Sequence, residues 1–137
     1  MTARFVASAL ASSFALATFL LAASQASAQS DPRYIRFSNS AAKGALYKPD
    51  SGPAPKIGVV VIHRTSNFMN HISATELAAR GFLVLGMNPR SDNNEAAVDW
   101  DANQLDLREG VEFMKKQPGI QKVVLLGHSG GGPTTSY

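Results

Sequence analysis

Short apolar runs alternate with amphipathic stretches along the chain from residue 34 onward. Runs at residues 57–62, 82–87 and 123–126 are almost continuously apolar, which is typical of strands buried on both faces of a sheet. The first of them, I-G-V-V-V-I, is rich in the β-branched residues that strands favour. Residues 34–37 and 44–47 are two weaker strand predictions, joined by a polar turn. We therefore predict five strands.

Two stretches between these runs have the composition of helices. Residues 73–80 contain good helix formers and stop before Gly81, and residues 98–116 carry spaced apolar positions and stop before a Pro-Gly pair. Residues 48–56 hold three prolines and a glycine, which favour a loop. Strands separated by helices of this length predict right-handed crossovers. We expect an α/β fold with a mostly parallel sheet and helices on both faces.

The first 28 residues differ from the rest and predict a secretory signal peptide. Arg4 is followed by an apolar run at residues 14–23 and by A-S-A at residues 26–28, which fits an A-x-A cleavage site. The alternative is an uncleaved anchor, but the run is shorter than the ~20 apolar residues of a membrane span. We predict a signal peptide at 1–28 and part of one domain at 29–137. The mature chain is expected to be periplasmic or secreted, without a stable membrane anchor.

Composition excludes several classes of partner and cofactor. Cleavage after Ala28 removes only Arg4 among the charged residues, so the formal charge falls from +3 to +2. Charges of both signs are interspersed, and no basic cluster predicts binding to nucleic acid. The chain has no cysteine, which excludes disulfides and cysteine-ligated metal sites. We expect neither a metal nor an organic cofactor.

The third apolar run leads directly into G-H-S-G-G at residues 127–131, which fits the pattern G-x-S-x-G. After a buried strand and before a helix, this pattern predicts a nucleophile elbow. Ser129 is then the nucleophile, the N–H of Gly130 is an oxyanion donor, and Gly127 and Gly131 are small because the turn is tight. The alternatives are a plain strand-to-helix turn or a phosphate-binding loop. A Walker-type loop would need a lysine that Pro133 and Thr134 do not supply.

With this motif in its context, the chain from residue 34 to 137 resembles the N-terminal half of the α/β-hydrolase family, which opens with an antiparallel hairpin. In that family the loop after the strand at residues 57–62 begins His-Gly and donates a second N–H to the oxyanion. Here the loop begins with His63 and Arg64, so the resemblance implies that the backbone of Thr65, or that of its neighbour Arg64, is the donor. Arg64 stands where the family usually has glycine.

The resemblance places the triad acid and histidine after the nucleophile, in a part of the fold that this chain does not include. We therefore expect a fold truncated after the elbow. His128 is the variable residue of the elbow, His63 is expected to order the oxyanion loop, and His71 is expected to be solvated. Acidic residues before the second helix are expected to cap it (Asp92, Glu95, Asp99 and Asp101).

These observations predict an exported serine hydrolase that acts on a small-molecule ester, thioester or amide through an acyl-serine intermediate. The chain as given is expected to be inactive, because it lacks a base. Two alternatives stay open: a non-catalytic binding or scaffold protein derived from the same fold, and an acyltransferase or perhydrolase on that fold.

Overall fold

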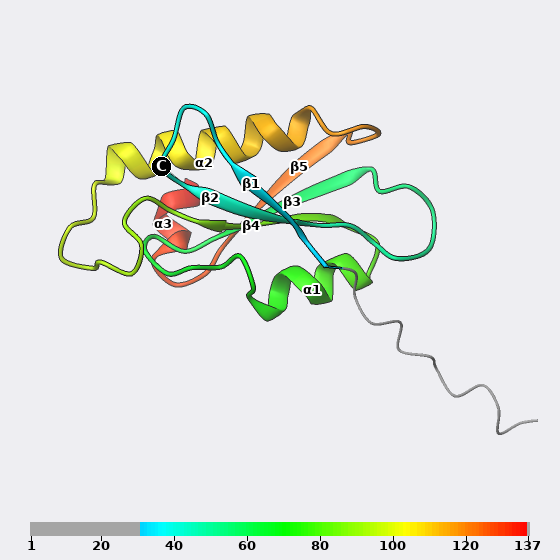
Figure 1. Ribbon diagram of the computed structural model, residues 1–137, viewed down its shortest axis with the longest axis horizontal. Helices are drawn as coiled ribbons and strands as arrows, with labels where there is room; N and C mark the ends of the chain where they lie inside the picture. Colours follow the sequence, from blue (N-terminus) through cyan, green and yellow to red (C-terminus); the bar gives the residue numbers. More distant parts are fainter. Residues whose placement is uncertain (1–30, 137) are drawn as a thin grey trace, which may run out of the picture.

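The computed structural model describes residues 31–136, so the predicted signal peptide lies outside the described residues. The chain forms five strands and three helices in the described part, drawn in Figure 1. Their order is β1 (Arg33–Arg36), β2 (Lys43–Tyr47), β3 (Ile57–Ile62), α1 (Ile72–Ala79), β4 (Leu83–Asn88), α2 (Trp100–Lys115), β5 (Lys122–Gly127) and α3 (Gly131–Ser136). The five strands and the two longer helices were all predicted, with bounds that differ by one or two residues at most.

The strands form one mixed sheet in the order β1-β2-β4-β3-β5. β1 pairs antiparallel with β2, and β2 pairs antiparallel with β4, whereas β3 pairs parallel with both β4 and β5. The prediction of a mostly parallel sheet is therefore only partly right: β3, β4 and β5 are parallel, whereas the two pairings made by β2 are both antiparallel. The parallel part is confined to the three strands that alternate with α1 and α2.

Helices α1 and α2 cover opposite faces of the sheet (Figure 1). On one face Val60, Ile62 and Leu85 pack with Leu107 and Met114 of α2. On the other face Val59, Val61 and Val84 pack with Ala74 and Ala78 of α1. Successive residues of a strand point to opposite faces, so the unbroken apolar runs of β3 and β4 follow from having a helix on each side.

The parallel strands also determine where the loops meet. β3, β4 and β5 run in the same direction, so their carboxyl ends lie at one edge of the sheet. Residues 63–66, 89–99 and 128–131 follow these three ends. The predicted oxyanion loop and the predicted elbow are therefore neighbours in space. Among the helices of residues 31–136, none is long and apolar enough to cross a membrane.

Candidate active site

Ser129 lies in a strained turn between β5 and α3. Its φ angle is 50°, in the left-handed region that residues with a Cβ rarely adopt. Backbone hydrogen bonds hold the turn on both sides, since His128 N donates to Ile62 O at 3.1 Å and Gly131 N donates to His128 O at 2.7 Å. Non-glycine strain of this kind concentrates at functional sites. The turn leaves Ser129 exposed above the carboxyl end of the sheet.

The glycines on either side of Ser129 are required by close backbone approach. A Cβ on Gly127 would overlap the Gly131 carbonyl and lie 2.7 Å from Gly132 N. A Cβ on Gly131 would overlap the Ile62 carbonyl and lie 2.9 Å from its carbon. These obstacles are backbone atoms, which cannot rotate away as the end of a side chain can. The turn therefore tolerates no side chain at positions 127 and 131.

The segment after β3 is ordered by the His63 side chain. His63 Nδ1 accepts hydrogen bonds from Thr65 N at 3.2 Å and from Ser66 N at 2.9 Å. A ring nitrogen that accepts is unprotonated, so this arrangement needs neutral His63. Burial is the main cause that lowers the pKa of His63, and the charges of Arg64 and His128 lower it further against an opposing effect of Glu95. The prediction that His63 orders this loop matches these contacts.

The two implied loop donors, Arg64 and Thr65, lie beside the elbow in different ways. The Arg64 side chain runs over Gly130, since a Cβ there would lie 2.6 Å from Arg64 Cγ. The Thr65 N–H is directed at His63. A substrate oxygen would therefore compete with the imidazole for the Thr65 N–H. The structure places the Arg64 side chain against Gly130, and the roles of residues 64, 65 and 130 as oxyanion donors stay predictions.

Three imidazoles and a phenyl ring pack together next to the turn. His71 stacks on the buried ring of Phe68, with ring centroids 4.1 Å apart. The His63 ring also stacks with Phe68, at a centroid distance of 5.7 Å. The exposed His128 ring lies 5.5 Å from Phe68. The prediction that His71 is solvated is wrong, because it is half-buried against Phe68 and caps α1 by accepting from Ser73 N.

The acidic residues before α2 do not share one role. Asp99 is the N-cap of α2 and accepts from Ala102 N at 2.9 Å, and Asp101 lies in the first turn. Asp92 accepts a hydrogen bond from Asn88 instead. Glu95 accepts from the Thr65 hydroxyl and forms an ion pair with Arg64. The predicted capping role is therefore wrong for Asp92 and Glu95, and no signal in the sequence connects Glu95 to the oxyanion loop.

No side chain in the part of the chain that the structure describes is hydrogen-bonded to the Ser129 hydroxyl as a base would be. The hydrogen bonds of residues 31–136 include none between the Ser129 hydroxyl and an imidazole. In the same residues, no group of three or more histidines and carboxylates is placed to hold a metal ion. The candidate site in these residues therefore consists of the exposed Ser129 in its strained turn and the neighbouring segment at residues 63–66.

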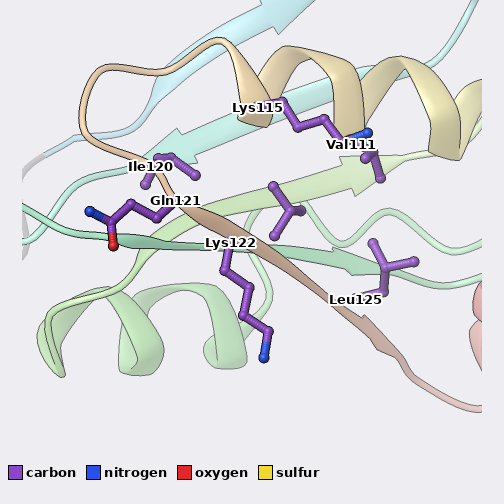
Figure 2. Close-up of a pocket in the computed structure, with 7 residues that line it drawn as sticks. Val111, Lys115, Ile120, Gln121, Lys122 and Leu125 are labelled. Atoms are coloured by element: carbon purple, nitrogen blue, oxygen red, sulfur yellow. The ribbon is translucent and has the colours of Figure 1, made fainter.

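A surface hollow of about 420 Å³ lies elsewhere, against the amino half of β5 (Figure 2). Its lining includes Val111 and Lys115 of α2 and Lys122 and Leu125 of β5. Figure 2 shows that these side chains flank the strand between its start and its middle. Ser129 follows the opposite end of β5, so this hollow is not part of the candidate active site.

Solved structures with the α/β-hydrolase fold resemble the described chain. A protein designated m3DLH is 20% identical, with a TM-score of 0.62 over 75% of this chain and 51% of its own. A dienelactone hydrolase-like promiscuous phosphotriesterase from metagenomic libraries is 18% identical, with a TM-score of 0.59 over 77% of this chain and 52% of its own. Est1E from Butyrivibrio proteoclasticus is 18% identical, with a TM-score of 0.56 over 77% and 43%. The fold of this chain is that of the α/β-hydrolases.

The likeness lies in the fold and not in the sequence. No protein-family model and no curated protein sequence gives a match. The chain spans about half the length of the solved structures it resembles, or less. Function is therefore argued below from the site itself.

Proposed function

We propose that the protein is an exported serine hydrolase that cleaves an ester, thioester or amide of a small molecule. Ser129 attacks the acyl carbonyl, and the alcohol, thiol or amine leaves as an acyl-serine forms. Backbone N–H groups of Gly130 and of Arg64 or Thr65 stabilise the oxyanion, each worth about 2.7–4 kcal/mol in comparable sites. Water then hydrolyses the acyl-serine. The base and its acid partner are not assigned among the described residues.

The observation that carries this proposal is the conformation of Ser129. Glycine adopts a φ of 50° without strain, so a plain strand-to-helix turn would have glycine at this position. Here a serine occupies it, although glycines stand close by at 127, 130 and 131. The strain is maintained by backbone contacts at Gly127 and Gly131 that leave the hydroxyl exposed. Such a turn fits a nucleophile better than it fits a phosphate-binding loop, which presents backbone N–H groups rather than a hydroxyl.

The test uses the product of natural length purified from its host. Its intact mass reports signal cleavage, for which we expect Gln29 as the first residue, and it reports the C-terminus. The same sample is assayed with p-nitrophenyl acetate and labelled with a fluorophosphonate, which reacts with activated serines. We expect label on Ser129 and an activity that Ser129→Ala abolishes. An unlabelled, inactive product would refute the hydrolase and favour a scaffold protein.

A further inference from the structure

The loop between β4 and α2 reaches back to the oxyanion segment and holds it from two directions. Asn93 N donates to Thr65 O at 2.7 Å, and the Glu95 carboxylate accepts from the Thr65 hydroxyl and pairs with the Arg64 guanidinium. From α2, Asn103 Nδ2 donates to Arg64 O at 2.9 Å. Both backbone and side-chain atoms of residues 64 and 65 are therefore bound by this loop and its helix.

Arg64 continues this connection to the other half of the oxyanion hole. Its aliphatic part lies against Gly130, where a Cβ would be 2.6 Å from Arg64 Cγ and 2.9 Å from Arg64 Nε. Its guanidinium carbon lies 5.9 Å from the centre of the Trp100 ring, at the start of α2. One side chain thus contacts the residue that follows the nucleophile while its charged end is held by Glu95.

We propose that Glu95 is a positioning residue for the oxyanion hole, acting through Arg64 and Thr65. The inference rests on the proposed function, since it concerns the same site. Glu95 holds the Thr65 hydroxyl and the Arg64 side chain at once, and Arg64 lies against Gly130. Glu95 therefore sets, together with Asn93 and Asn103, the distance between the N–H donors on the two sides of the turn, and it does so without contact to Ser129.

The ion pair between Glu95 and Arg64 is too exposed to serve mainly the stability of the fold. The Arg64 and Glu95 side chains are 37% and 49% exposed, and exposed ion pairs contribute little to the free energy of unfolding. Thr65, by contrast, is fully buried, so the carboxylate fixes a rigid part of the loop. The hydrogen bond from Thr65 is the main cause that lowers the pKa of Glu95, which keeps it ionised at neutral pH.

The experiment compares Glu95→Ala and Glu95→Gln in the product of natural length, with kcat and KM measured on p-nitrophenyl acetate. A trifluoromethyl ketone that forms an oxyanion on the serine gives a second readout. The matched control is Glu76→Gln on α1, which removes another exposed ion pair, Glu76 with Arg80 at 2.7 Å. Thermal melting checks that each variant is folded.

We expect Glu95→Ala to lower kcat about 10- to 100-fold and to weaken the ketone by a similar factor, with KM within about twofold. Glu95→Gln keeps an acceptor for Thr65 and should fall between the wild type and Glu95→Ala. Folded Glu95 variants with wild-type kcat and inhibitor affinity would overturn the inference, as would an equal loss in Glu76→Gln. A wild-type protein without Ser129-dependent activity would instead refute the proposed function, so the two failures are distinguishable.

Discussion

Alanine substitutions in the turn test whether positions 127 and 131 require glycine for steric reasons, while position 132 does not. A Cβ at position 127 would lie 2.7 Å from Gly132 N, whereas ordinary contact begins at 3.4 Å, so the backbone must move by about 0.7 Å or more. Gly131→Ala meets the Ile62 backbone in the same way. A displacement near 1 Å at a reacting group costs about 100-fold in rate. We therefore expect each substitution to lower kcat about 100-fold.

Gly132→Ala is the matched control, because a Cβ at this position meets nothing within 4 Å and the residue lies in α3. It should leave kcat within about twofold and, through the higher helix propensity of alanine, should not destabilise the protein. The assay is hydrolysis of p-nitrophenyl acetate by the product of natural length, alongside urea denaturation. If Gly127→Ala and Gly132→Ala had the same kcat, the steric account of the turn would be refuted.

Two further predictions concern stability. Asp106 is fully buried and binds Arg90 at 2.7 Å. The Arg90 side chain is 31% exposed, so its charge stays partly hydrated, and Asp106→Ala should cost about 1.5–3 kcal/mol in the free energy of unfolding by urea; a cost below about 1 kcal/mol would contradict this. For His63, whose pKa is lowered in the fold chiefly by burial against the opposing charge of Glu95, the folded protein binds fewer protons than the unfolded chain. Stability is therefore complete above the ordinary pKa of 6.5 and falls as the pH falls below it. The difference between urea midpoints at pH 7.5 and pH 5.0 should shrink in His63→Gln, and an unchanged difference would assign the effect to other groups.

Local patterns predicted most of the elements and the family resemblance implied the antiparallel pairing of the first two strands, but neither predicted that β2 pairs antiparallel with β4. β3 was predicted at its observed bounds because a run of β-branched residues between polar flanks permits few alternatives. β2 has five residues, and its sequence K-G-A-L-Y fits any neighbour. Its antiparallel pairing with β4 depends on contacts between residues 37 to 45 positions apart, which periodicity does not report. The pairing of β2 with β4 could not be predicted for this reason.

The candidate site also has one part that the sequence predicts and one part that it does not. Ser129 and its glycines follow from a contiguous pattern whose steric logic is local. The link from Glu95 to Arg64 and Thr65 joins residues 30 or more positions apart, through an exposed loop whose acidic residues predict capping of α2 instead. The sequence predicts a solvated His71 because its stacking on Phe68 results from how the loop lies on the sheet. Contacts made through loops need the fold as well as the sequence.

The packing of Arg64 on Gly130 couples two positions that are far apart in the sequence. They share one volume, so a side chain at 130 would require the Arg64 side chain to move. Because Arg64 is also paired with Glu95, a substitution at the residue after Ser129 would be transmitted to the loop between β4 and α2.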